Sequence, residues 1–286
     1  MPELFLTIFF ISILLIFLGT GIWVALSMVG VSAIGMFLFT SRPVGDAMAT
    51  TIWGTSSSWT LTALPLFVWM GEILFRTKLS ENLFKGLAPW LSRLPGGLIH
   101  VNVVGCALFA AISGSSAATV ATVGKMSIPE LRKRNYPEKL LLGSLAGSGT
   151  LGLLIPPSII LIIYGVTVQE SIAKLFIAGI IPGIMLAIFF MLYVIGWSVL
   201  NKKIMPKMDE TFSFFQKIKQ SGQLIPVIVL ILAVIGSIYV GIATATEAAS
   251  LGVVGALILS FFQKSLNKET FKLSLLGATK TSCMIA

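Results

Sequence analysis

Two short stretches of this sequence combine hydroxyl side chains with glycine or proline, a combination that can bind ions. In the first, residues 113–119 read Ser-Gly-Ser-Ser-Ala-Ala-Thr. Hydroxyl and carbonyl oxygens suit a small cation, and Gly114 lets backbone groups approach a ligand closely. A helix that starts after this turn would also present free N–H groups and a positive dipole end, which suit a carboxylate. The stretch could hold an ion and an organic acid together; a small-residue surface for helix packing is the alternative.

The second stretch, residues 147–158, reads Gly-Ser-Gly-Thr-Leu-Gly-Leu-Leu-Ile-Pro-Pro-Ser within an apolar run. Proline removes a helix hydrogen bond and clashes with the preceding turn, so Pro156 and Pro157 are expected to unwind or kink the segment. The carbonyl groups freed in this way need a partner. A Na⁺ ion held between the two stretches would satisfy them, and neighbouring helices or water are the alternative partners.

The remaining candidate groups favour structural roles. Glu247 opens an apolar segment, and we expect it to make a structural hydrogen bond, although a buried acid could also act in transport. Glu72 lies four residues before Arg76, which predicts an ion pair on one helix face. His100 is expected to pack at an interface or between helices. The two cysteines have neither the spacing of a disulfide framework nor that of a metal site.

Composition places both stretches in a membrane protein. The chain has 286 residues, of which 56% are hydrophobic and 11% are charged, whereas soluble domains carry about 25% charged residues. A cleaved signal peptide is the alternative for the first apolar run, but no lysine or arginine precedes that run. We therefore predict an all-α polytopic membrane protein. Runs that approach or exceed the roughly 20 residues needed to cross a bilayer include 4–18, 24–39, 175–200 and 224–240.

Basic residues give these helices an orientation. The net charge of +9 comes from short clusters between apolar runs, so it indicates topology and argues against nucleic-acid binding. Such clusters favour the cytoplasmic side of the membrane. They lie at 76–93, 125–139, 202–219 and 264–272.

Residues 94–134 have basic flanks at both ends and the hydroxyl-rich stretch in the middle. One continuous helix between the flanks would be about 55 Å long, too long for one crossing, whereas two arms of about 15 to 18 residues would be marginal for spanning. The sequence therefore predicts a re-entrant helical hairpin with the hydroxyl-rich stretch at its tip. Such a tip is tolerated only inside protein or beside a water-filled cavity.

The two ends of the chain share a weak repeat. Residues 21–39 and 241–261 have similar small-residue patterns about 220 positions apart, and each follows an apolar helix. The charge argument gives the two copies opposite orientations, as in transporters whose inverted repeats place substrate and ion sites at the repeat interface. Convergent composition of membrane helices is the alternative.

These patterns divide the chain into four regions, the last of which is an incomplete second repeat. An amphipathic stretch at 80–92 is expected to lie along the membrane interface, and for a similar stretch at 209–220 a cytoplasmic loop is the alternative. The regions are scaffold helices with an interfacial arm helix (1–93), a transport region with the hairpin (94–134) and an unwound helix (140–164) within 94–173, a connecting helix with an interfacial helix (174–221), and the start of the second repeat (222–286).

Several enzyme classes find no support in the sequence. It contains no GxxxxGK[ST] motif, no HExxH motif, and no histidine or cysteine cluster. We therefore expect neither ATP hydrolysis nor an intramembrane enzyme, and no cofactor or transition metal. An ion gradient or a partner protein must supply the driving force.

Three stretches carry a resemblance to a known family. They are residues 65–72 (Pro-Leu-Phe-Val-Trp-Met-Gly-Glu), 110–121 (Ala-Ala-Ile-Ser-Gly-Ser-Ser-Ala-Ala-Thr-Val-Ala) and 147–158. In order and spacing they resemble the large membrane subunit of tripartite ATP-independent periplasmic (TRAP) transporters. Residues 245–249 add a similarity to the central region of that subunit, so the resemblance extends over the whole chain.

The resemblance implies a sodium-coupled, elevator-type importer of organic acids, such as dicarboxylates or sialic acid, in the bacterial inner membrane. It implies two partners, a small four-helix membrane subunit (Q type) and a soluble periplasmic substrate-binding protein (P type). Substrate contacts would come from the hairpin tip, at Ser116, Ala117 and Thr119. Carried over residue by residue, the sodium site would comprise Ser113, Ser115, Ser116, Gly147, Thr150 and Pro156.

Members of this family normally continue past the equivalent of Ala286 through a second hairpin and a second unwound segment. We therefore expect the chain to be truncated and to transport only when it is completed. Two other functions stay open. One is a sodium/dicarboxylate symporter that needs no binding protein, and the other is a membrane scaffold that does not transport.

Overall fold

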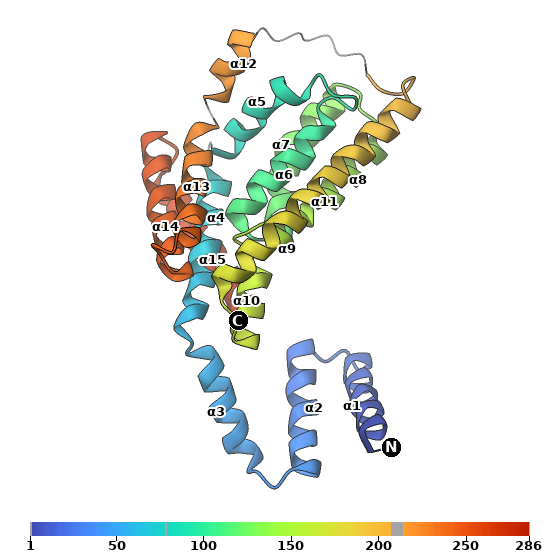
Figure 1. Ribbon diagram of the computed structural model, residues 1–286, viewed down its shortest axis with the longest axis vertical. Coiled ribbons are helices and arrows are strands. Elements are labelled where there is room, and N and C mark those ends of the chain that lie inside the picture. The colour runs from blue at the N-terminus through green and yellow to red at the C-terminus, as the bar shows by residue number, and fades with distance from the viewer. Residues whose placement is uncertain (1, 78, 207–213, 223, 286) are drawn as a thin grey trace. The chain divides into compact units, whose positions relative to one another are not determined.

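The computed structural model describes residues 2–77, 79–206, 214–222 and 224–285, and the regular elements in these ranges are all helices (Figure 1). The predicted all-α fold is therefore confirmed. The chain forms two compact units, Met1–Ser58 and Trp59–Ala286, so the boundary falls inside the predicted scaffold region, residues 1–93. Within the described residues, three helical stretches are each long and apolar enough to cross a membrane: Glu138–Val168, Ile172–Leu200 and Ala245–Phe262.

The first unit is built on close contacts between glycine and phenylalanine. It contains α1 (Pro2–Gly19), α2 (Val24–Phe39) and α3 (Val44–Ser56). A Cβ atom on Gly30 would lie 2.6 Å from the Phe17 ring, and one on Gly35 would lie 2.6 Å from the Phe10 ring. Because these two glycines have no side chain, the two rings can pack directly on the backbone of α2.

The same turn occurs at two places about 220 residues apart. After α1, Gly21 has φ +81°, and after α13 (Ile225–Tyr239), Gly241 has φ +77°. Isoleucine follows both glycines, at Ile22 and Ile242, and a new helix begins within four residues. Positive φ favours glycine strongly, so the weak sequence repeat coincides with a matching backbone turn.

The second unit carries the other elements, in which two groups of helices pack together (Figure 1). In one group α4 packs against α14 and α15. In the other, α6, α7, α8 and α11 lie side by side. The elements are η1 (Trp59–Thr62), α4 (Ala63–Arg76), α5 (Leu79–Leu91), α6 (Ile99–Ser113), α7 (Ser116–Lys133), α8 (Glu138–Gly149), α9 (Leu151–Leu154), α10 (Ile159–Val168), α11 (Ile172–Leu200), α12 (Phe214–Ser221), α13, α14 (Ala245–Phe262) and α15 (Lys268–Ile285).

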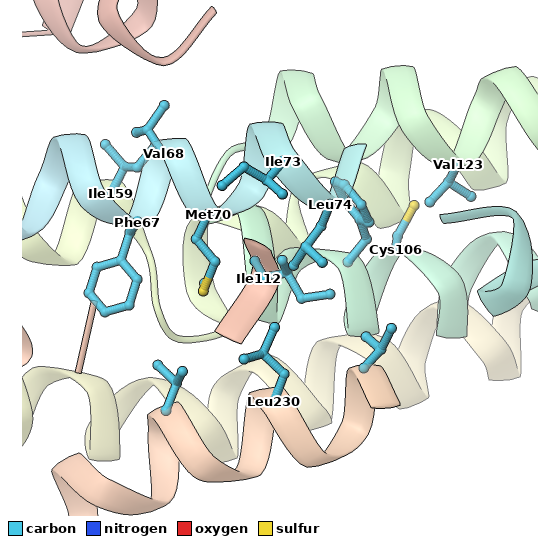
Figure 2. Close-up of a cluster of buried hydrophobic side chains, with 14 of the residues drawn as sticks. Phe67, Val68, Met70, Ile73, Leu74, Cys106, Ile112, Val123, Ile159 and Leu230 are labelled. Atoms are coloured by element: carbon cyan, nitrogen blue, oxygen red, sulfur yellow. The ribbon is translucent and has the colours of Figure 1, made fainter. Parts of the chain in front are cut away.

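Helix α4 joins the two groups through a buried apolar cluster (Figure 2). The Phe67 ring meets the Phe176 ring of α11 edge-on, with centroids 6.2 Å apart. Trp69, two residues after Phe67 on α4, donates from Nε1 to the Ser274 hydroxyl of α15 over 3.3 Å. These contacts fix α4 between the hairpin group and the C-terminal helices.

Two predictions for acidic residues are confirmed. Arg76 donates to the Glu72 carboxylate over 2.9 Å, as the spacing on one helix face indicated. Glu247 forms a capping box at the start of α14, because its carboxylate accepts from the Thr244 amide at 2.8 Å while the Thr244 hydroxyl faces the Glu247 amide. Glu247 therefore has a structural role at a helix end.

The two amphipathic segments contact each other. Trp90 of α5 donates to the Ser221 hydroxyl of α12 over 2.6 Å, and the Lys217 ammonium lies 5.4 Å from the Trp90 ring centroid. The predicted interfacial stretch 209–220 is helical from Phe214 onward, and its residues 209–213 lie outside the described residues. A cation over an aromatic face adds a modest attraction to this contact.

A single phenol closes the base of the hairpin formed by α6 and α7. The Leu98 amide, directly before α6, donates to the Tyr136 hydroxyl, after α7, over 3.1 Å. Burial raises the pKa of the Tyr136 phenol, so the hydroxyl keeps its proton far above neutral pH. Both ends of the hairpin therefore meet at one place.

Replacing Tyr136 with phenylalanine should lower the free energy of unfolding by about 1 to 3 kcal/mol, because a buried amide loses its acceptor. The midpoint of thermal unfolding in detergent measures the effect. Tyr193→Phe on the exposed face of α11 is the matched control, since the Tyr193 side chain is 64% exposed. Equal midpoints for the two variants would contradict the proposed closure.

Candidate functional site

The hydroxyl-rich stretch forms a tight turn between two packed helices. Helix α6 ends at Ser113, Gly114 adopts the left-handed conformation with φ +59°, and Ser115 is extended and caps α7. The Ser113 hydroxyl lies 3.0 Å from the Thr119 hydroxyl and 3.4 Å from the Ser115 amide. Farther from the tip, a Cβ on Gly105 of α6 would lie 3.7 Å from Val123 of α7. Earlier residues of α6 thus meet later residues of α7, so the two helices run antiparallel.

The proline-containing stretch interrupts its helix as the sequence predicted. Helix α8 ends at Gly149, the short helix α9 follows, and the chain is extended at Ile155 and again at Ser158 before α10 begins. The Ser158 hydroxyl donates to the Leu153 carbonyl over 2.7 Å and so bridges the break. The Pro156-Pro157 pair lies in this gap and is buried.

The hairpin tip and the helix break pack directly on each other. The Ile159 amide of α10 donates to the Gly114 carbonyl over 3.2 Å. A Cβ on Gly114 would lie 2.5 Å from the Pro157 carbonyl oxygen, and one on Gly152 would lie 2.8 Å from the Ser116 amide nitrogen. Two interrupted segments that are about 40 residues apart in sequence thus meet backbone to backbone.

Helix α11 supports the break from another side. A Cβ on Gly179 would lie 2.7 Å from the Leu154 carbonyl oxygen, and one on Gly183 would lie 2.8 Å from the Ile155 side chain. Glycines four residues apart lie on one helix face. The break therefore lies between the hairpin tip and a glycine face of α11.

Several polar groups at this junction have no hydrogen-bond partner among the described residues. The Pro157 carbonyl accepts no hydrogen bond there, and the amides of Ser116 and Ala117 donate none. The Ser116 hydroxyl is buried and also unpartnered. Uncharged oxygens beside the N-terminus of an 18-residue helix offer both cation ligands and an anion-attracting dipole end.

The residues predicted to bind sodium fall into two sets. Ser113, Ser115 and Ser116 lie at the tip together with Thr119, and Pro156 lies in the break. The side chains or backbone groups of the other two have different contacts. Gly147 faces α11, because a Cβ there would lie 3.1 Å from the Phe190 ring.

Thr150 is exposed, and its hydroxyl donates to the Gly147 carbonyl over 2.7 Å. That carbonyl also accepts the Thr150 amide at 3.1 Å. The Gly147 carbonyl is thus hydrogen-bonded to both the hydroxyl and the amide of Thr150. Of the predicted substrate residues, Ala117 is exposed, while Thr119 is buried and bonded to Ser113.

Sequence reasoning missed two residues that shape the junction. Gly152 lets the tip approach α9, and the Ser158 hydroxyl spans the break. A serine directly after two prolines and before an apolar run is a helix-start signal, so Ser158 could have been identified. Nothing in the sequence separates Gly152 from the neighbouring glycines.

Comparison with known proteins identifies the family. The profile of the family described as "Tripartite ATP-independent periplasmic transporter, DctM component" matches residues 9–286. The chain belongs to the DctM family. The resemblance seen in the hairpin and helix-break sequences is therefore confirmed, and membrane embedding of the DctM chain agrees with its apolar helices.

Curated DctM relatives extend over most of this chain. The C4-dicarboxylate TRAP transporter large permease protein DctM of Pseudomonas aeruginosa is 34% identical over 80% of the chain and 53% of its own length. The protein of the same name from Rhodobacter capsulatus is 32% identical over 98% of the chain and 66% of its own length. The isethionate TRAP transporter permease protein DctMQ of Oleidesulfovibrio alaskensis is 32% identical over 94% of the chain and 42% of its own length. The chain thus spans about half the length of these relatives.

Proposed function

We propose that this DctM chain belongs to a sodium-coupled permease that imports small organic anions across a bacterial inner membrane. The observation that carries the proposal is the contact between the hairpin tip and the helix break, where the Pro157 carbonyl lies against Gly114. Interrupted helices at membrane depth are tolerated where they line a protein-enclosed site. In secondary transporters such segments form the ion and substrate sites.

Sodium is the proposed coupling ion because the oxygen atoms at this junction that have no partner among the described residues are uncharged. The Ser116 hydroxyl and the Pro157 carbonyl are hard ligands that a small cation accepts. The anion would lie at the start of α7, where the amides of Ser116 and Ala117 have no acceptor among the described residues. C4-dicarboxylates and isethionate, named in the relatives' descriptions, are anions of this kind.

The proposal includes an elevator-type inverted repeat and two partner proteins. The matched turns at Gly21 and Gly241 support the repeat. A periplasmic binding protein would deliver the substrate, and a small membrane subunit of the Q type would complete the permease. One relative is named permease protein DctMQ, a name that joins the letters M and Q. The small subunit is therefore sought both as a separate chain and as a part fused to the permease.

Uptake by a completed protein tests the proposal. This chain would be joined to the part of the Rhodobacter capsulatus relative that lies outside the 66% it matches, and reconstituted with that system's small subunit and binding protein. We expect uptake of a labelled C4-dicarboxylate only with an inward sodium gradient and with the binding protein. Uptake without the binding protein would favour the symporter alternative. Assembly of the subunits without any uptake would favour the scaffold.

Ser116→Ala in the same protein should raise the sodium concentration that gives half-maximal uptake about tenfold, because one uncharged ligand to a cation is lost. Ser237→Ala on α13, whose hydroxyl bonds its own helix at Val234, is the matched control. Unchanged sodium activation in Ser116→Ala would argue against the tip as an ion site.

A further inference from the structure

A second group of buried polar side chains lies away from the tip, between α6, α7 and α8. Asn102 on α6 is 0% exposed, and Ser127 on α7 is also 0% exposed. On α8, Ser144 and Ser148 are buried as well. Asn102 lies three turns of α6 before the tip, so this group is separate from the proposed ion site.

Asn102 binds α8 through both its side chain and its backbone. Its Nδ2 donates to the Leu141 carbonyl over 3.3 Å and to the Ser144 hydroxyl over 3.1 Å. The Ser148 hydroxyl, 3.4 Å from the Asn102 carbonyl, is in turn 2.6 Å from the Ser144 carbonyl. These bonds connect one residue of the hairpin to two successive turns of α8.

The orientation of the Asn102 amide follows from these partners. A backbone carbonyl accepts only from a donor, so the group that faces the Leu141 carbonyl must be the NH₂ group and not the amide oxygen. Oδ1 therefore points away from α8. It is buried and has no hydrogen-bond partner among the described residues.

Ser127 faces the same space from α7. On α7, Val123 packs against Gly105 of α6, while Gly124 packs against Leu145 of α8, where a Cβ would lie 2.8 Å from the leucine side chain. Ser127 lies four residues after Val123 and three after Gly124, so it is one turn along the same face. In the antiparallel hairpin, one turn forward on α7 corresponds to one turn back on α6, which is the level of Asn102. The Ser127 hydroxyl is also buried and, among the described residues, unpartnered.

We infer that Asn102 and Ser127 are positioning residues, joined by hydrogen bonds through one bridging water between the Ser127 hydroxyl and Asn102 Oδ1. The water would give each atom the partner that it lacks, and an unmade hydrogen bond in a buried site is costly. The bridge would tie both hairpin arms to α8. Because the far end of α8 carries the helix break, this three-helix node keeps the tip and the break in register.

The buried cysteine next to this node can report on it. Cys106 lies one turn after Asn102 on α6 and is 0% exposed. The other cysteine of the chain, Cys283, is exposed. In a Cys283→Ser background, the rate at which N-ethylmaleimide modifies Cys106 therefore measures local opening between α6 and α8.

Two variants that differ only in one hydroxyl isolate the proposed bond. Ser127→Thr and Ser127→Val have nearly the same shape, so any strain from the added methyl groups is shared. We expect Cys106 to react about fivefold faster in Ser127→Val than in Ser127→Thr, which corresponds to one hydrogen bond. In an Asn102→Leu background, the two variants should react at the same rate, because the acceptor is gone.

Ser260→Ala on α14 is the control for loss of a buried hydroxyl elsewhere, since Ser260 is 0% exposed and its hydroxyl donates to the Ala256 carbonyl of its own helix. It should leave the Cys106 rate unchanged. Equal rates for Ser127→Thr and Ser127→Val would overturn the inference. So would a difference that persists in Asn102→Leu. If Asn102→Leu does not fold, the comparison of Ser127→Thr with Ser127→Val in the otherwise native chain still tests the inference. None of these measurements depends on sodium or substrate.

Discussion

Replacing Gly114 with alanine is expected to lower the free energy of unfolding by at least about 2 kcal/mol, for two separate reasons. Gly114 has φ +59°, a conformation that costs other residues about 1 to 3 kcal/mol. In addition, the new Cβ would lie 2.5 Å from the Pro157 carbonyl oxygen, which is a backbone atom and cannot rotate away. The hairpin tip would have to move off the helix break.

The midpoint of thermal unfolding in detergent measures this effect, and two further variants separate the two reasons. Gly143→Ala on α8, where nothing lies within 4 Å of the added atom, should be neutral or stabilising by up to about 1 kcal/mol. Gly114→Asn tolerates the left-handed conformation but still places a Cβ against Pro157. We expect Gly114→Asn to stay well below the native midpoint. Recovery to the native value would show that the close approach is not rigid.

Gly152→Ala should also destabilise the protein, by about 1 to 3 kcal/mol, although alanine is the better helix former. Gly152 lies in α9, and the added Cβ would lie 2.8 Å from the Ser116 nitrogen and 2.9 Å from the Ser115 carbonyl carbon. The backbone of the tip fills the space that the methyl group needs. Helix propensity therefore predicts a gain in stability and packing predicts a loss, and we expect the effect of packing to be the greater of the two.

The same unfolding measurement tests this variant, with Gly143→Ala again as the control for propensity alone. The double variant Gly114→Ala/Gly152→Ala should lose less stability than the sum of the single variants, because either substitution already separates the tip from the break. Strict additivity, or a raised midpoint for Gly152→Ala, would mean that the two close contacts do not belong to one interface.

The hairpin and the helix break could be predicted from sequence because each has a strong local cause. A glycine among serines interrupts an apolar run between basic flanks, and a pair of prolines cannot continue a helix. The structure has its breaks at these positions, from Gly114 to Ser115 and from Ile155 to Ser158. The local sequence decides where a helix ends, so the positions of both breaks could be predicted.

The direction in which individual residues point from their helix could not be predicted in the same way. Gly147 and Thr150 belong to the predicted stretch, yet Gly147 faces Phe190 and Thr150 is exposed. Which side of α8 meets the tip depends on how α8 is rotated about its axis, and its packing against α6, α7 and α11 sets that rotation. Residue type alone does not contain this information.

The node around Asn102 was missed for a related reason. Serines in an apolar helix are compatible with close packing, and a lone asparagine carries no motif. The available signal was the spacing of Ser144 and Ser148, which are four residues apart and so form a polar line on one face of α8. A polar line in an apolar helix calls for a polar partner on a neighbouring helix.

The closed base of the hairpin has a consequence for how the protein is inserted into a membrane. Because the Leu98 amide reaches the Tyr136 hydroxyl, the chain enters and leaves the hairpin at one place. A re-entrant hairpin, as predicted for residues 94–134, would contribute no net crossing, so the sidedness of α8 and of every later helix would be the same before and after the hairpin is in position. The insertion machinery can therefore fix the topology of the flanking helices first. The hairpin can then enter late, once its protein surroundings exist to receive the polar tip.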